Sequence, residues 1–127
     1  MKKFFLFAIA LALVTVTGCG SGFVQTGGTI TFDDGTPVPL GGIVFETDTF
    51  MAEGQIRTDG TYTLTSLRPG DGLPAGNYRV GISAVEVDEN DRRTYHVDPK
   101  FANPATSGFT ADVSKGNSRF DFTVSRP

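Results

Sequence analysis

Short runs in which apolar and polar residues alternate constrain this chain more than any other feature. Ile30 and Phe32 alternate with threonines, and Phe120 and Phe122 alternate with polar residues near the end of the chain. A period of two, carried by aromatic and β-branched residues, is typical of strands with one face in a core and the other in water. No window after the first 18 residues shows the spacing of an amphipathic helix. The pattern therefore predicts an all-β domain.

Glycine, proline and aspartate separate these runs. The chain has 16 Gly and 7 Pro in 127 residues, a share above the usual one of roughly 12%, and the segments 33–37, 58–60 and 114–117 have the composition of turns. Without helices to cover a parallel sheet, we expect a seven-stranded antiparallel β-sandwich. The expected strands lie in residues 29–32, 43–45, 55–57, 61–65, 77–82, 109–113 and 120–124.

The alternation also predicts which side chains point inward. The predicted core residues are Ile30, Phe32, Val44, Ile56, Tyr62, Leu64, Tyr78, Val80, Ile82, Phe109, Val113, Phe120 and Phe122. The hydroxyls of Tyr62 and Tyr78 are expected to reach backbone partners at the edge of the core.

One segment, residues 88–107, does not follow the rhythm. It begins with a polar run, continues through prolines, and is long for a loop in a small domain. Loops of this length are usually functional or disordered. Two interpretations stay open: a solvated crossover between the sheets, or a ligand-contact loop in which Tyr95, His96 and Phe101 are the candidate contacts.

The first residues have the features of a secretory signal. Lys2 and Lys3 precede an apolar run from Phe4 to Val16, which is shorter than the roughly 20 residues that a helix needs to cross a bilayer. We therefore expect residues 1–18 to be a targeting segment that is removed, rather than a lasting transmembrane anchor.

The end of this run, Val16-Thr17-Gly18-Cys19, resembles the lipobox of bacterial lipoproteins. The resemblance implies that the signal is cut before Cys19, that the Cys19 sulfur receives a diacylglyceryl group, and that the new N-terminus is acylated with a fatty acid such as palmitate. Several acyl chains attach a protein stably to a membrane. Gly20, rather than an aspartate, follows Cys19, and by the sorting rule of such lipoproteins this favours the outer membrane of a two-membrane cell.

Residues 19–27 are expected to form a flexible tether, because they are rich in glycine and small polar residues. Cys19 is the only cysteine, so no disulfide can form within the chain. The acidic residues (14) outnumber the basic ones (11), two of which lie in the signal segment. This balance does not favour binding to nucleic acid or to anionic lipid.

Glycines and core aromatics form a series of motifs along the domain, which are Gly28-Thr29-Ile30, Gly35-Thr36-Pro37-Val38, Gly42-Ile43-Val44-Phe45, Thr58-Asp59-Gly60-Thr61-Tyr62-Thr63-Leu64 and Gly76-Asn77-Tyr78-Arg79-Val80. With these motifs, residues 28–127 resemble the carboxypeptidase regulatory-like family, and the resemblance implies a transthyretin-like (prealbumin-like) sandwich. Because the motifs build turns and packing, the resemblance implies a fold and no particular activity.

Catalysis is not expected. One His and one Cys cannot by themselves supply a His/Cys metal site or a Cys–His nucleophile, and the acidic run at residues 88–91 lacks the spacing of a calcium loop. We therefore expect no cofactor and no metal.

The sequence favours a non-catalytic structural or protein-interaction module at the cell envelope, with the membrane and an envelope protein as partners. The alternative is a carbohydrate-binding module at the cell surface that uses exposed aromatic residues, for which Phe50, Tyr95 and Phe101 are the candidates.

Overall fold

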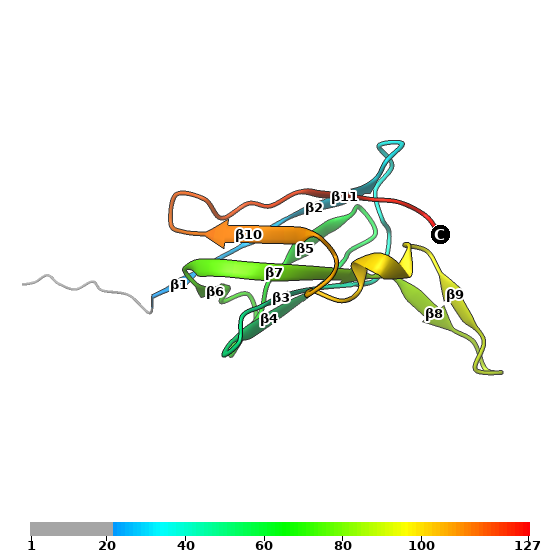
Figure 1. The fold of residues 1–127 in the computed structure, drawn as a ribbon, viewed down its shortest axis with the longest axis horizontal. Coiled ribbons are helices and arrows are strands. Elements are labelled where there is room, and N and C mark those ends of the chain that lie inside the picture. The colour runs from blue at the N-terminus through cyan, green and yellow to red at the C-terminus, as the bar shows by residue number, and fades with distance from the viewer. Residues whose placement is uncertain (1–21) are drawn as a thin grey trace, which may run out of the picture.

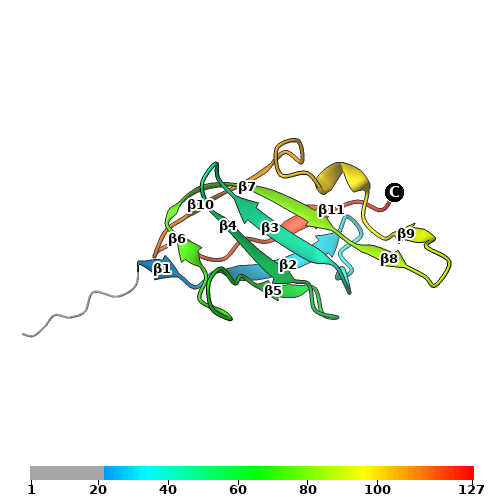
Figure 2. The ribbon, with the colours of Figure 1, turned by 90° about the horizontal axis from the view of Figure 1, so that it is seen from below.

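Two sheets face each other across one apolar core in the computed structural model of the chain, which describes residues 22–127 (Figures 1 and 2). The signal segment and Cys19 lie outside the described residues. The larger sheet is antiparallel and contains, in spatial order, β10 (Phe109–Val113), β7 (Gly76–Ser83), β3 (Gly42–Glu46) and β4 (Met51–Gln55). The smaller sheet contains β11 (Phe122–Val124), β2 (Gly27–Phe32) and β5 (Thr61–Thr63).

Two short ribbons extend this sandwich. One pairs β1 (Phe23–Val24) with β6 (Leu73–Pro74), and the other pairs β8 (Val85–Val87) with β9 (Arg93–Tyr95). A short 3-10 helix, η2 (Pro99–Phe101), follows β9. The β1–β6 ribbon and the β8–β9 hairpin lie at opposite ends of the long axis (Figures 1 and 2).

The predicted all-β sandwich is confirmed, with seven strands in its two main sheets. It is not wholly antiparallel, because β11 runs parallel to β2. The strand expected at residues 55–57 is instead β4 at Met51–Gln55. Its position is set by the preceding turn, in which the Thr47 amide donates to the Phe50 carbonyl at 2.8 Å and the Thr47 hydroxyl accepts from the Phe50 amide. This turn aligns β4 with β3.

Phe45 lies at the centre of the core and is fully buried. Its ring packs against Tyr62, Tyr78, Phe120 and Phe122, with ring centroids 5.9–6.4 Å apart. The two tyrosine hydroxyls donate to backbone carbonyls, as predicted, Tyr62 to Phe120 at 2.6 Å and Tyr78 to Pro74 at 2.7 Å. Each tyrosine therefore keeps its polar atom satisfied while its ring fills the core.

Most of the predicted core is confirmed. The buried members of the predicted set are Ile30, Phe32, Ile56, Tyr62, Leu64, Tyr78, Val80, Ile82 and Val113, and the half-buried members that pack against the core are Phe109, Phe120 and Phe122. Val44 was predicted wrongly, since it points to the outer face of β3 while Ile43 and Phe45 point inward. Three consecutive apolar residues fit either phase of a strand, and pairing with β4 and β7 selects one of them.

The predicted tether over residues 19–27 overlaps the folded domain. Phe23 and Val24 pair with β6, Val24 is buried, and the buried Thr26 hydroxyl donates to the Val24 carbonyl at 2.8 Å. This apolar pair covers one end of the core, and its backbone groups are hydrogen-bonded to β6. The fold therefore begins before Gly28.

The segment 88–107 is not a single loop. Its first part completes the β8–β9 hairpin, in which Asp91 adopts a left-handed conformation at φ 62°. Its second part contains η2 and then approaches the larger sheet, where the Ser107 hydroxyl donates to the Val80 carbonyl. Within residues 22–127, no helix is long and apolar enough to cross a membrane.

Replacing Phe45 by alanine tests the central packing. We expect Phe45→Ala to lower the free energy of unfolding by about 3–5 kcal/mol, because the change leaves a cavity between the sheets. The matched control is Val44→Ala on the outer face, with an expected loss of about 1 kcal/mol or less. Denaturant unfolding measures both, and equal losses would contradict the packing described here.

Candidate functional site

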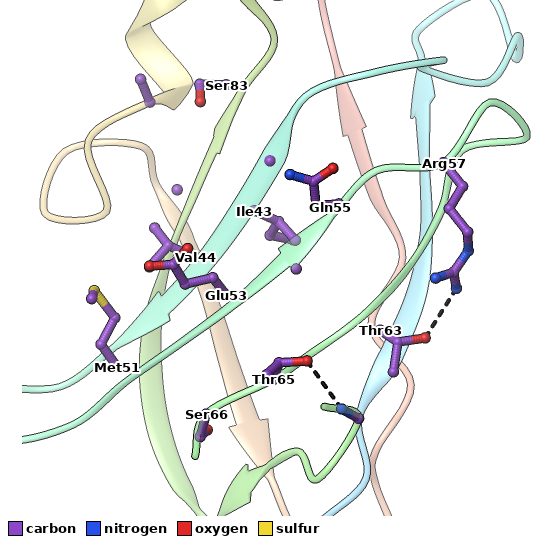
Figure 3. A pocket seen from close by; sticks show the side chains of 15 residues that line it. Ile43, Val44, Met51, Glu53, Gln55, Arg57, Thr63, Thr65, Ser66 and Ser83 are labelled. Atoms are coloured by element: carbon purple, nitrogen blue, oxygen red, sulfur yellow. Dashed lines mark hydrogen bonds between the residues drawn. The ribbon is translucent and has the colours of Figure 1, made fainter. Parts of the chain in front are cut away.

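A depression of about 880 Å³ lies on the outer face of the larger sheet (Figure 3). Its floor is low because two outward positions, Gly42 in β3 and Gly81 in β7, carry no side chain. Val44, the next outward residue of β3 after Gly42, lies opposite Gly81. At Gly81 the chain after η2 comes close, and an added Cβ would lie 2.6 Å from the Ala102 carbonyl oxygen. Glycine is therefore required there, and Ala102 forms one wall of the depression.

Polar side chains surround this floor. Gln55 and Ser83 flank Gly42 in one row across three strands, and Glu53 and Gly81 flank Val44 in the next row. Strands are spaced about 4.8 Å apart, so the outer side chains of a row stand roughly 10 Å apart. Among residues 22–127, no ion pair involves Glu53.

Arg57 is held at the far end of the depression. Its guanidinium donates to the hydroxyls of Thr61 and Thr63, each at 3.0 Å, and Figure 3 shows the contact with Thr63. Nearby, the Thr65 hydroxyl accepts from the Gly70 amide at 3.0 Å. The depression thus presents carboxylate, amide, hydroxyl and guanidinium groups, which suit a hydroxyl-rich ligand. Among residues 22–127, no aromatic side chain lines it.

A smaller depression of about 490 Å³ lies beside β9, near the C-terminal residues. Its lining residues are Phe32, Thr36, Pro37, Pro39, Tyr95, His96, Arg126 and Pro127. The Arg126 guanidinium stacks 3.9 Å from the centroid of the Phe32 ring and pairs with the Asp34 carboxylate at 3.2 Å. Arg126 therefore has a fixed position in this depression.

The structure brings together two of the three residues predicted for a ligand-contact loop. Tyr95 is 42% exposed and lines the smaller depression with His96, whose Nε2 lies 2.6 Å from a Glu86 carboxylate oxygen. Phe101 lies elsewhere and stacks on Phe109 with the ring centroids 5.2 Å apart. Ligand contact by any of the three stays a prediction.

Phe50, which was proposed as a sugar contact, packs edge-on against Phe23 with the ring centroids 5.8 Å apart. Tyr95 is therefore the most exposed of the three aromatic candidates for sugar stacking.

Sequence reasoning did not find the larger depression. Its residues come from five separate segments, and only strand register places Gln55, Gly42 and Ser83 in one row. The glycines in β3 and β7 were available as a signal, since glycine within a strand often marks a close backbone approach.

Among residues 22–127, no group of three or more His, Cys, Asp or Glu side chains has the arrangement of a metal site.

Two turns with the same sequence, Asp-Gly-Thr, fix the loops around the smaller sheet. In each turn an aspartate accepts from the threonine amide at 3.0 Å and from the threonine hydroxyl at 2.6 Å, in the pairs Asp34–Thr36 and Asp59–Thr61. The Thr36 hydroxyl, the Thr36 amide and Arg126 together lower the pKa of Asp34 from 3.8 to about 2. The Thr61 hydroxyl and amide lower the pKa of Asp59 in the same way.

No family model matches the chain, and no curated protein matches it. Among solved structures, it is similar to a variant of the major pilin subunit of Bacillus cereus, with 13% sequence identity and a TM-score of 0.47. The match covers 82% of this chain and 30% of the pilin. The resemblance to the carboxypeptidase regulatory-like family stays a prediction.

The Asp34 turn beside the smaller depression can be tested by titration. We expect Thr36→Val to raise the pKa of Asp34 from about 2 toward 3.8, because the hydroxyl hydrogen bond is lost. Since the pKa is lowered in the folded chain, the carboxylate stabilises the fold at higher pH, and this contribution is lost as the pH falls through about 2.

NMR titration of the carboxyl carbons measures this shift. Thr61→Val is the matched control, and it should raise the pKa of Asp59 while leaving that of Asp34 unchanged. A pKa of Asp34 that stays at about 2 in Thr36→Val would refute the assigned cause.

Proposed function

We propose that this chain is a lipid-anchored protein of the cell envelope whose β-sandwich is a non-catalytic structural or protein-interaction module. The observation that carries the proposal is the position of Cys19 directly after a charged start and an apolar run. In this account the signal ends at residue 18, and acyl chains on Cys19 hold the domain at the membrane. The outer membrane is the proposed location in a two-membrane cell.

The position of β1 determines which end of the domain the proposed anchor would hold near the membrane. Only a few residues separate Cys19 from β1, so lipid on Cys19 would hold that end of the domain within about 15 Å of the membrane surface. The β8–β9 hairpin lies at the other end of the long axis (Figures 1 and 2). The hairpin and the smaller depression therefore lie far from the anchored end of the domain (Figures 1 and 2) and are available to partners.

The proposed role is binding rather than catalysis, as the side chains suggest. The buried tyrosines serve the core, where burial raises the pKa of both Tyr62 and Tyr78. Neither hydroxyl is therefore set up to ionise in a reaction.

Carbohydrate binding is the second candidate, favoured by the polar lining of the larger depression. Glu53, Gln55 and Ser83 present the carboxylate, amide and hydroxyl groups that hydrogen-bond sugar hydroxyls. The roughly 10 Å between outer side chains of a row is wide enough for a sugar ring.

Lipid attachment is tested by metabolic labelling with a fatty-acid probe. We expect Cys19→Ala to abolish labelling and to leave an uncleaved precursor, because the acceptor sulfur is missing. Ser21→Ala is the control and should be labelled as fully as the wild type. Undiminished labelling of Cys19→Ala would refute the anchor.

A glycan array probed with the full chain separates the two functional classes. If the larger depression binds sugar, Gln55→Ala should weaken binding about tenfold, because a hydrogen bond to the ligand is lost. Tyr95→Ala, in the smaller depression, is the control and should have no effect. Binding lost only in Tyr95→Ala would move the site to the smaller depression, and absence of any binding would favour a protein-contact role.

A further inference from the structure

The β8–β9 hairpin projects from one end of the sandwich (Figures 1 and 2). All three residues of β9 are exposed, and Val87 on β8 is 55% exposed. An isolated two-stranded ribbon is at best marginally stable in water. An exposed ribbon with apolar side chains therefore suggests a surface that another strand covers.

Local hydrogen bonds hold the hairpin in one shape. At its tip, Asp88 accepts from the amides of Asn90 and Arg92 at 2.8 and 2.9 Å. At its base, the His96 amide donates to the Ala84 carbonyl at 2.8 Å, and the His96 ring pairs with Glu86. The edge of β9 is thus presented in a fixed geometry.

These bonds also fix the direction of the backbone groups of β9. The hydrogen bonds between Asp88 and Arg92 and between Ala84 and His96 set the phase of the antiparallel ladder. In that phase Thr94 bonds to β8, whereas the N–H and C=O groups of Arg93 and Tyr95 point away from β8. The outer edge of β9 therefore offers donors and acceptors to another strand.

We propose that β9 pairs antiparallel with β9 of a second copy of this chain, about a two-fold axis at Thr94. In this register Arg93 lies opposite the second copy's Tyr95, and their outward N–H and C=O groups bond to each other. The two-fold axis makes the same bonds a second time. The two hairpins then form one four-stranded sheet that neither copy makes alone.

The side chains on this edge are self-complementary. Arg93 and Tyr95 lie on the same face of β9, so the pairing places each guanidinium beside the tyrosine ring of the other copy, a favourable cation–π contact. Among residues 22–127, Arg93 has no ion-pair partner. Thr94 meets the second copy's Thr94, and paired threonines are compatible across strands.

The other edge of the hairpin does not favour such pairing. A two-fold axis at the centre of β8 would place Glu86 directly opposite the second copy's Glu86. Like charges in directly opposed positions destabilise a sheet. The two edges therefore differ, and β9 is the one that can pair with itself.

The smaller depression of one copy lies where the proposed pairing brings the hairpin tip of the other. Antiparallel pairing brings the tip of one hairpin, which carries Glu89 and Asp91, beside the base of the other, where Arg126 lines the depression next to Tyr95. Acidic groups thus approach a guanidinium. The two sandwiches lie at opposite ends of the joined sheet, because each hairpin projects from its own domain (Figure 1).

Cysteine crosslinking tests the pairing without depending on the lipid anchor. In the full chain with Cys19→Ser, Thr94→Cys places two sulfurs across the two-fold axis from each other, with Cβ atoms about 4.5 Å apart, close enough for a disulfide. Thr110→Cys is the matched control, an exposed threonine in the edge strand β10. We expect roughly tenfold more disulfide dimer from Thr94→Cys, since pairing raises the effective concentration of its thiols.

A second variant separates pairing from chance contact. Adding Arg93→Glu to Thr94→Cys should reduce the dimer to the level of the Thr110→Cys control, while an unchanged circular dichroism spectrum shows that the fold persists. Equal crosslinking of Thr94→Cys and Thr110→Cys, or no effect of Arg93→Glu, would overturn the proposal. Loss of lipid labelling has no bearing on either result.

Discussion

The packing of Phe45 between the two sheets is the interaction on which the rest of this structure depends. The ring comes from β3, in the middle of the larger sheet, and contacts aromatic rings contributed by both sheets. Tyr62 and Tyr78 can join this cluster only because their hydroxyls find backbone carbonyls at its edge. The core is thus filled by large aromatic side chains with satisfied polar atoms, in a chain that has no cysteine pair to cross-link it.

This core leaves the recognition features to the outside of the molecule. The inward side chains serve packing, whereas Glu53, Gln55, Arg93 and Tyr95 are exposed on strands whose opposite sides or bases are anchored in the fold. Rigid strands hold such groups in defined positions better than loops do. The distribution of these groups is consistent with the proposed role in binding at the cell envelope.

Much of the fold could be predicted from the sequence, and the errors have physical causes. Alternation identified the strands around Ile30, Tyr78 and Phe122 because each has one face in the core and one in water. It gave the wrong face for Val44, because three consecutive apolar residues do not show which of them point inward. It also missed the two ribbons, whose strands are too short to show a period. The depressions escaped prediction because they depend on the register between strands that are distant in sequence. Cys19 lies outside the described residues, so the lipid site stays a prediction.

Residue-resolved amide hydrogen exchange tests the central claim most directly, because it reads the packing and the strand edges in one experiment. Our account predicts that the amides near Phe45 in β3 and Val80 in β7, which are hydrogen-bonded within the larger sheet, exchange slowest and only through global unfolding. At low protein concentration, the outward amides of Arg93 and Tyr95 should exchange fastest in the hairpin. Rapid exchange throughout β3 and β7, at the rate of the hairpin edge, would contradict a sandwich built around Phe45.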